Sequence, residues 1–344
     1  MELSKRVKEA AKARKRANEP IWSLIKETKD NNNLSPDQRR KLLETLYDSL
    51  TIQDLQEKHI YDAHKFGVGV SYRGGIVDLQ RTKRLMIRLG TTIFQGANPK
   101  LKDRAFAESL GVPVPKTYQQ GVPLSELHLI PHTIVKPVSG AASKGVFYVD
   151  RDLKLQSVFS SESYSSVAEA KEEIERFKKS ISTNKWIVEQ AILSESGAPA
   201  NDFKVFVFYG KIGMYLEVDR ANYTRARYAF YDADGNTLDY GPKYKNSTFP
   251  GTGVPARIVE YAITLSQAAP VPFLRLDFHD GEDGLFLGEI TPHPGGTYAN
   301  EQYDSVDRML GKYMADAKAR LYIDMFNGKE YTEFRESYGP FAPL

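Results

Sequence analysis

Apolar side chains follow a helical period through the first part of the chain. Leucine and tyrosine recur at helical spacing over residues 42–50, which gives one apolar face. Ahead of them, Ser35, Pro36 and Gln38 stand where an N-cap, a first helical residue and the third residue of a capping box are expected. Three asparagines at 31–33 break the pattern. The sequence therefore predicts a helical hairpin over residues 20–58, which packs or contacts a partner and carries no chemistry.

The pattern is mixed after this hairpin. GVGVSY and RGGIVDL, over residues 67–79, are rich in glycine and predict turns, whereas RTKRLMIRL predicts a helix. KLKDRAFAESL predicts a helix that ends at Gly111, and the segment VPVPKTY that follows is extended. HTIVKPVSGAASKGVFYV predicts two strands joined by a loop of small residues, which is the pattern of a hairpin.

Strand and helix patterns alternate through the rest of the chain. We expect a helix near residues 167–180, a buried strand in KWIVEQAI, and a hairpin over FKVFVFYGKIGMYLEVDR that turns at Tyr209 and Gly210. Residues 221–256 are aromatic-rich and predict loops, whereas ARIVEYAITLSQAA and residues 303–326 predict helices. Hairpins among helices indicate an α+β fold with antiparallel sheets.

A second predicted hairpin, Phe273 to Thr297, places carboxylates inside two apolar runs. Side chains alternate between the two faces of a strand. In the first strand, one face holds Leu274, Leu276 and Phe278, and the other holds Arg275, Asp277 and His279. In the second strand, one face holds Glu289 and Thr291, and the opposite face holds Phe286, Gly288 and Ile290.

The turn HDGEDG brings these strands back antiparallel and sets Asp277 roughly opposite Glu289. Two carboxylates on one face repel each other unless a cation lies between them or one is protonated. Carboxylate oxygens suit Mg²⁺, which usually takes its other ligands from water and phosphate. The pair therefore points to a nucleotide, and the alternative is a solvent-facing sheet edge with scattered charges.

Lys136 ends an apolar strand and enters the small-residue loop PVSGAASKG, with Lys144 on the far side of the loop. Lysine ammonium groups and the backbone N–H groups of such a loop bind phosphates. The glycine-lysine signature of a P-loop is absent, and a plain hairpin turn is the alternative. Downstream, the backbone from Glu189 to Ile192 could pair with an adenine edge or form a crossover between domains.

Length and composition limit the remaining possibilities. The chain of 344 residues allows about two domains, and 41% apolar with 26% charged residues is typical of a soluble globular protein. The absence of cysteine excludes disulfides, thiolate catalysis and cysteine-ligated metals, and it fits a cytoplasmic location. Neither a membrane-spanning run nor a secretory signal is visible.

A net charge of +3 gives no reason to expect nucleic acid as a partner. The basic excess is local, because residues 1–20 hold seven lysines and arginines against three glutamates. This segment predicts a helix that could touch an acidic polymer or a membrane surface, although a solvated helix is the preferred interpretation. Whether the chain forms a homodimer is left open by the sequence.

Four motifs in order over about residues 100–297 resemble the ATP-grasp superfamily. PKLKDRAFAESLGVPVPKT is similar to its entry helix and strand, TIVKP to its phosphate-binding lysine strand, WIVEQAI to its adenine hinge, and RLDF with LGEITPHPGG to its metal hairpin. NDFKVFVFYGKI, VDR, VPFLRLDFHD and FLGEITPHPGG resemble the TupA-like (teichuronopeptide biosynthesis) branch. The resemblance does not cover residues 1–60.

The resemblance implies an ATP-grasp fold, in which two α+β lobes clasp ATP, preceded by a helical extension. The expected division is a helical extension over 1–60, an N-terminal subdomain over 61–120, a central lid subdomain over 121–192 and a C-terminal subdomain with the metal site over 193–344. The cofactors implied are ATP and Mg²⁺.

The resemblance also implies roles for individual residues. ATP would be bound by Lys100, Arg104, Lys136, Ser143, Lys144, Glu189, Gln190, Ala191, Ile192, Asp202 and Lys204. Mg²⁺ would be bound by Asp277, Glu289 and Thr291, and the catalytic residues would be Arg275, facing the reacting phosphoryl group, and Lys136. Two departures from the family pattern matter. Asp103-Arg104 replaces Asp-Lys, which leaves open whether Arg104 or Lys100 is the relevant cation, and Thr291 replaces an asparagine.

Substrate-binding residues are expected at Arg220, Arg225, Arg227, His293 and Gly295, where the arginines could hold a carboxylate and His293 could act as a base. A structural role for these residues is the alternative. The implied function is an ATP-dependent carboxylate–amine ligase that forms an amide through an acyl phosphate. Its partners would be an amine and an acid, either a uronic acid of a cell-surface polysaccharide or a peptide or natural-product acid. The alternatives are a phosphotransferase acting on a sugar or polyol hydroxyl, and a non-catalytic nucleotide-binding protein.

Overall fold

The computed structural model describes residues 2–50, 71–89, 93–94, 99–139, 143–177, 181, 183–220, 226–292, 294 and 302–339. Backbone contacts divide the chain into two compact units, Met1–Ser71 and Tyr72–Leu344. Within the described residues, no helix combines the length and the apolar character needed to cross a membrane.

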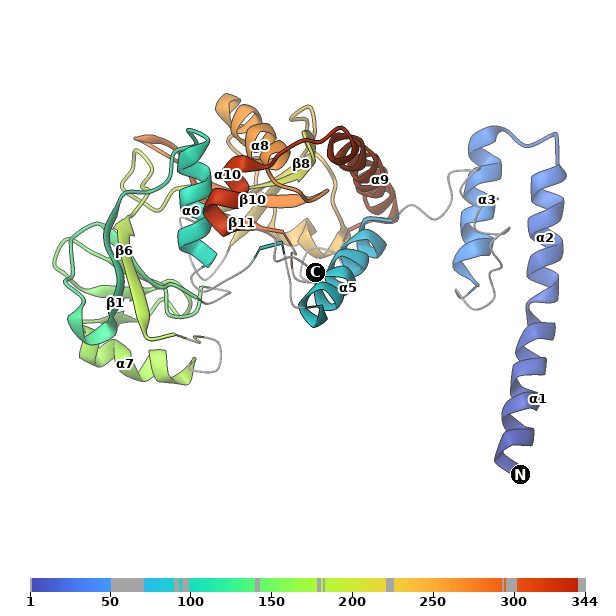
Figure 1. Cartoon of the computed structure of the whole chain (residues 1–344), viewed down its shortest axis with the longest axis horizontal. Helices are drawn as coiled ribbons and strands as arrows, with labels where there is room; N and C mark the ends of the chain where they lie inside the picture. Colours follow the sequence, from blue (N-terminus) through green and yellow to red (C-terminus); the bar gives the residue numbers. More distant parts are fainter. Residues whose placement is uncertain are drawn as a thin grey trace. The chain divides into compact units, whose positions relative to one another are not determined.

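The first unit contains three helices in its described part: α1 (Glu2–Ala17), α2 (Glu19–Asp30) and α3 (Pro36–Asp48) (Figure 1). The capping box of α3 forms as expected, because Ser35 Oγ accepts from the backbone N–H of Gln38 at 3.3 Å and Gln38 Oε1 accepts from that of Ser35 at 3.0 Å. Ile25, Leu43, Tyr47 and Leu50 form a small core. The helical hairpin is confirmed over α2 and α3, and residues 51–58 lie outside the described residues.

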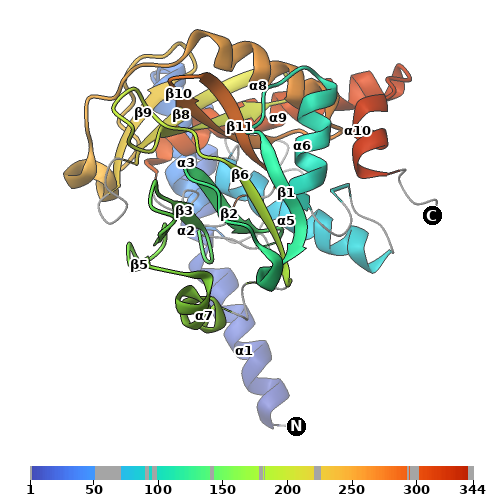
Figure 2. The same cartoon turned by 90° about the vertical axis from the view of Figure 1, so that its left-hand side faces the viewer.

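The second unit is built on two antiparallel sheets, which confirms the α+β expectation (Figure 2). In the described residues, the first sheet has six strands in the order β1 (Thr117–Pro123), β6 (Lys185–Gln190), β2 (Thr133–Pro137), β3 (Phe147–Val149), β4 (Leu155–Ser157) and β5 (Ser163–Tyr164). The second has five strands in the order β11 (Gly284–Thr291), β10 (Leu274–Gly281), β7 (Asn201–Phe208), β8 (Lys211–Asp219) and β9 (Arg227–Asp232).

Helices cover these sheets. The described ones are α5 (Tyr72–Arg88), α6 (Pro99–Ser109), α7 (Val167–Arg176), α8 (Ala256–Ala268), α9 (Asp304–Phe326) and α10 (Thr332–Tyr338), with short 3-10 helices at Leu124–Glu126 and Pro242–Ser247. Phe206 and Phe208 contact Tyr72 of α5, whereas Phe278 stacks on Tyr261 of α8. Because strand side chains alternate, α5 and α8 lie on opposite faces of the five-stranded sheet.

Glycines 74 and 75 lie inside α5, so the expectation of turns is wrong for residues 72–79. A Cβ on Gly75 would lie 2.9 Å from Cγ of Met314 in α9. The glycine is therefore used for close helix packing, and burial of Tyr72 and Ile76 against the sheet outweighs the low helix propensity of glycine. Residues 67–70 lie outside the described residues.

The expectation of loops over residues 221–256 is also wrong in part. Residues 227–232 form β9, the edge strand, which pairs antiparallel with β8. Its burial comes from tertiary packing, since the ring of Phe230 stacks on Tyr240 at 4.3 Å between centroids. The remaining expected elements form where the pattern places them, including the turn at Tyr209 and Gly210, both of which have positive φ.

Candidate active site

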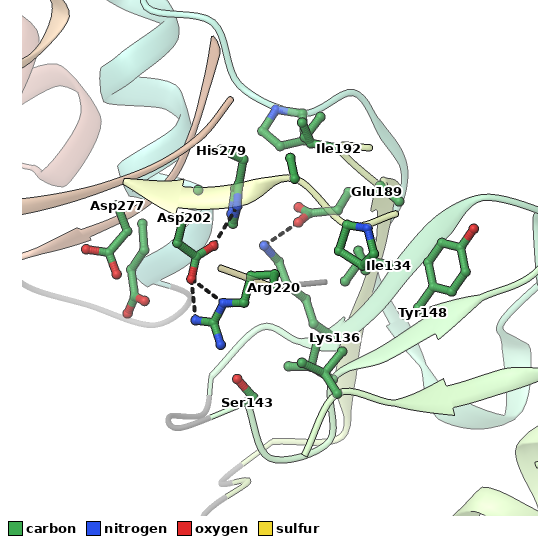
Figure 3. Close-up of a pocket in the computed structure, with 18 of the residues that line it drawn as sticks. Ile134, Lys136, Ser143, Tyr148, Glu189, Ile192, Asp202, Arg220, Asp277 and His279 are labelled. Carbon is green, nitrogen blue, oxygen red and sulfur yellow. Dashed lines mark hydrogen bonds and ion pairs between the residues drawn. The ribbon is translucent and has the colours of Figure 1, made fainter. Parts of the chain in front are cut away.

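A cavity of about 370 Å³ lies between the two sheets (Figure 3). One wall comes from β2, β6 and the segment after Ser143, and the other from β7, β10 and β11. Its acidic, basic and histidine lining residues are Lys100, Lys136, Lys144, Glu189, Asp202, Lys204, Arg220, Arg275, Asp277, His279 and Glu289. Residues up to 189 positions apart in the sequence therefore meet around one space.

The acidic hairpin has the register that strand alternation predicts at its centre, because Asp277 of β10 pairs with Glu289 of β11. The next pair is Phe278 with Leu287, which leaves Gly288 as an extra residue in a β-bulge. The assignment of Phe286 and Ile290 to one face is therefore wrong: Leu285, Leu287 and Ile290 are the buried residues. The bulge shifts the alternation by one residue.

Asp277 is 5% exposed and is held by two cations. Lys204 Nζ lies 2.5 Å from Asp277 Oδ2, and Arg275 Nε donates to Oδ1 at 2.7 Å. Burial by itself would raise the pKa of Asp277, but Lys204 and then Arg275 hold it below its ordinary value. Arg275 also donates to Thr291 Oγ1 at 3.2 Å, and Glu289 is exposed.

Asp202 forms a second buried carboxylate site on β7 (Figure 3). Arg220 Nε donates to Oδ2 at 2.7 Å, His279 Nδ1 lies 2.8 Å from Oδ1, and Lys204 Nζ lies 3.6 Å from Oδ2. Burial opposes ionisation, but Arg220, Lys204 and His279 together hold the pKa of Asp202 well below its ordinary value. Lys204 therefore lies between two ionised carboxylates, Asp202 and Asp277.

Glu189 is buried on β6 and binds two cations from different elements. Lys136 Nζ lies 2.5 Å from Oε1, and Arg104 Nη2 donates to Oε2 at 2.9 Å. Of the two cations that the sequence left open, Lys100 lines the cavity and donates to the Pro137 carbonyl at 3.2 Å, whereas Arg104 binds Glu189 and the Pro115 carbonyl. Burial, and then the charge of Lys136, lower the pKa of Lys100 to about 8.

The segment from Gln190 to Ile192 lines the cavity beside Glu189. The Gln190 side chain donates to Asp283 and accepts from the Lys116 backbone, so its polar atoms already have partners within the protein. Ser143 and Lys144 line the same cavity, with Lys144 Nζ 5.5 Å from the ring centroid of Phe177.

Of the expected substrate residues, only Arg220 lines this cavity among those that the structure describes. Arg227 instead pairs with Asp219 and lies 5.3 Å from the ring centroid of Phe249. Arg225, His293 and Gly295 lie outside the described residues.

Ile134 and His279 are among the cavity residues to which sequence reasoning gave no role. Ile134 lies two positions before Lys136 on β2, and His279 lies two positions after Asp277 on β10. The period of two along a strand places each on the face of its neighbour, so this signal was available in the sequence.

The acidic residues fit Mg²⁺ only as part of a shared site. In the part of the chain that the structure describes, no group of three or more histidine, aspartate or glutamate side chains could hold a metal ion. Mg²⁺ is commonly bound by one or two carboxylates together with waters and substrate phosphates. Asp277 and Glu289 meet that requirement, with Thr291 beside them, if a polyphosphate lies in the same cavity.

Comparison with solved structures finds ATP-grasp ligases. VanG D-Ala:D-Ser ligase from Enterococcus faecalis is 19% identical, with 65% of this chain and 61% of that chain covered and a TM-score of 0.39. ATP-grasp ligase PsnB, complexed with a minimal precursor, is 12% identical, with coverages of 77% and 75% and a TM-score of 0.37. D-alanine–D-alanine ligase from Bacillus anthracis, complexed with ATP, is 13% identical, with coverages of 71% and 76% and a TM-score of 0.40.

No curated protein sequence matches the chain. A family model does match, and its description is TupA-like ATPgrasp. The match runs from residue 125 to residue 315, which is more than half of the 344 residues, and it includes β2, β6 and the β10–β11 hairpin that line the cavity. The ATP-grasp fold expected from the sequence motifs is confirmed, and the chain belongs to the TupA-like ATP-grasp family.

Proposed function

We propose that the chain is an ATP-dependent carboxylate–amine ligase. One observation carries the proposal: a single cavity joins two facing carboxylates, Asp277 and Glu289, to the cations Lys100, Lys136 and Arg275. This combination suits a metal-bound triphosphate, because metal and lysine charges neutralise phosphate oxygens during phosphoryl transfer. ATP would lie along the cavity, with its phosphates toward the β10–β11 hairpin.

The reaction has two steps. An oxygen of the acid's carboxylate attacks the γ-phosphorus of ATP, the bond to the β-phosphate oxygen breaks, and ADP leaves. The amine nitrogen then attacks the carbonyl carbon of the acyl phosphate, inorganic phosphate leaves, and the nitrogen loses a proton to solvent. Neither step needs a protein nucleophile, which agrees with the absence of cysteine from the chain.

The protein contributes charge and position to both steps. Asp277 and Glu289, with Thr291, would hold Mg²⁺, which neutralises charge on the β- and γ-phosphates when bound. Arg275 is fixed by Asp277 at 2.7 Å, so its guanidinium needs little reorganisation to stabilise developing negative charge. Lys136, Ser143 and Lys144 would bind phosphates from the other wall.

The substrates are proposed from the family, with a uronic acid of a cell-surface polysaccharide or a peptide acid as the carboxylate. Of the arginines expected to bind substrate, Arg220 lines the cavity among the described residues, and it donates to Asp202. The subdomain division proposed from the motifs (61–120, 121–192 and 193–344) places the two cavity walls on separate lobes.

Product analysis tests the proposal. The protein is incubated with Mg²⁺-ATP and panels of acids and amines. ADP release is followed, and the masses of the products are measured by mass spectrometry. We expect ADP release that requires both an acid and an amine, with a product mass equal to their sum less one water. ADP release with an alcohol alone, accompanied by a stable phosphate ester, would identify a phosphotransferase and overturn the ligase.

A second expectation concerns pH and Lys100. Its pKa of about 8 means that the free protein loses this charge as pH rises from 7 to 9. Binding of ATP must then restore the proton, so affinity for ATP should fall about tenfold at pH 9 relative to pH 7. Calorimetric titration of Mg²⁺-ATP at several pH values, in buffers of different ionisation enthalpy, measures both the affinity and the proton uptake.

Two variants test whether Lys100 causes the fall in ATP affinity at high pH. Lys100→Arg should flatten the decrease, because the guanidinium stays protonated. Lys102→Arg, on the same helix but bonded to the Tyr338 carbonyl, should retain it. An unchanged decrease in Lys100→Arg would assign the titration to another group.

A further inference from the structure

His279 is a cavity residue to which neither the sequence motifs nor the proposed reaction gives a role. It lies on β10, on the face of Arg275 and Asp277, and pairs across the sheet with Asp202. Its Nδ1 lies 2.8 Å from Asp202 Oδ1 (Figure 3). An ionised carboxylate can only accept, so Nδ1 carries the proton and donates it. This bond fixes the orientation of the ring.

Gly288 provides the space that the ring occupies. A Cβ built on Gly288 would lie 2.5 Å from His279 Nε2 and 2.9 Å from Cδ2. Any other residue at 288 would therefore displace the imidazole. The bulge between the Asp277–Glu289 and Phe278–Leu287 pairs brings Gly288 to this place. One ring edge is thus held by Asp202 and another lies against Gly288, yet the side chain is still 34% exposed.

The surroundings of His279 differ from those of Asp277. A Cβ on Gly281, two residues further along β10, would lie 2.5 Å from Cγ2 of Ile192, so the hinge segment reaches this end of the hairpin. Ile134, Val146 and Ile192 line the cavity with His279, whereas Arg275 and Asp277 lie about 7 Å or more further along the strand. The cavity therefore has the metal-hairpin charges Arg275, Asp277 and Glu289 on one side of His279, and apolar lining residues beside the ring that Asp202 holds.

We propose that His279, held by Asp202 and seated against Gly288, is the platform on which the base of the bound nucleotide stacks, and that it selects purine over pyrimidine nucleotides. The inference rests on the proposed function, because it requires ATP in this cavity. The metal-hairpin charges fix the triphosphate, so a base attached to it extends toward His279. A purine covers more of an imidazole face than a pyrimidine does, and base preferences of aromatic sites come from stacking strength, so stacking on His279 should favour the purine. His279 is a positioning residue and takes no part in the chemical steps.

Direct binding tests this role without relying on turnover. The full-length protein and its His279→Ala variant are titrated with Mg²⁺-ATP, Mg²⁺-CTP and Mg²⁺-tripolyphosphate, which has no base. We expect the variant to bind ATP about tenfold or more weakly, to lose most of the preference for ATP over CTP, and to bind tripolyphosphate as the wild type does. His279→Phe, which keeps an aromatic face but loses the bond to Asp202, should retain most of the preference.

His128→Ala is the matched control, because His128 is exposed and does not line the cavity. Nuclear magnetic resonance adds a measurement that would not change with ATP if His279 had only a structural role. The imidazole Cε1–H signal that is missing in His279→Phe should shift upfield with ATP and stay in place with tripolyphosphate.

The outcomes separate the two proposals. If the wild type binds none of the three ligands, the proposed function itself fails. If the wild type binds ATP and His279→Ala keeps both its affinity and its preference over CTP, the stacking role is wrong while the nucleotide site stands. Equal weakening for tripolyphosphate and ATP would show a general distortion of the site and would likewise overturn the stacking role.

Discussion

Replacement of Glu289 by glutamine should lower Mg²⁺-ATP turnover about 10³-fold while leaving the fold intact. The carboxylate faces Asp277 across the hairpin, and the amide that replaces it cannot supply a negatively charged ligand. Because Glu289 is exposed, the substitution should change the free energy of unfolding by no more than about 0.5 kcal/mol. ADP release and thermal unfolding, measured on the same preparation, check both parts.

Glu282→Gln is the matched control. It makes the same chemical change on an exposed residue of the same hairpin, at the turn and outside the cavity lining. Full activity in Glu289→Gln would overturn the proposed role of Glu289 in binding Mg²⁺. Asp277→Asn is a less direct test, because Asp277 is buried between Lys204 and Arg275 and its replacement also disturbs the packing of those cations.

The pairing of Asp277 with Glu289 could be predicted because it depends only on local rules. Two strands, a short turn and the alternation of side chains are enough to place one carboxylate opposite the other. The bulge at Gly288 could not be predicted, since an apolar–polar pattern does not reveal which residue of a strand is left unpaired. The bulge explains the error for Phe286, whereas His279 lies on the face that the alternation of β10 predicts.

The ion pairs of the site depend on tertiary structure. Lys204 and Asp277 are 73 positions apart, and Arg104 and Glu189 are 85 positions apart. The motifs identified these residues, but their pairing follows from the order of strands within each sheet and from the placement of α6. The roles expected for these residues came from the family resemblance. The structure adds their contacts within the protein, such as the ion pair in which Lys136 Nζ lies 2.5 Å from Glu189 Oε1.

The helix and strand errors have a similar origin. Local propensity favours a turn at Gly74-Gly75, yet the helix forms because Gly75 allows close approach to Met314. Residues 227–232 show no regular alternation of apolar and polar side chains. They nevertheless form the edge strand β9, which pairs with β8. In both cases long-range packing decides the local structure.

Lys204→Met should be the most destabilising of the single substitutions considered, by about 3–5 kcal/mol. The lysine is buried and lies 2.5 Å from Asp277 and 3.6 Å from Asp202. Methionine keeps most of the volume but removes the cation that lies between two buried carboxylates, Asp202 of β7 and Asp277 of β10. The melting temperature should fall by about 10 °C, and turnover should fall with it because Asp277 loses its position.

Lys211→Met is the matched control, because it makes the same substitution at an exposed lysine at the far end of the β7–β8 hairpin. It should leave the melting temperature unchanged. Acid unfolding gives an independent check. The depressed pKa values of Asp202 and Asp277 contribute stability that is present above the unfolded pKa of about 4 and is lost as pH falls toward the folded values.

Without Lys204 the pKa of Asp277 rises toward its unfolded value, so the loss of stability below pH about 4 should be shallower in the variant than in the wild type. The double variant Lys204→Met with Asp277→Asn removes one of the opposed carboxylates and should recover part of the lost melting temperature. If the double variant is destabilised by the sum of the two single effects, Lys204 and Asp277 are not coupled, and Lys204 stabilises the sheet through its packing and its pair with Asp202.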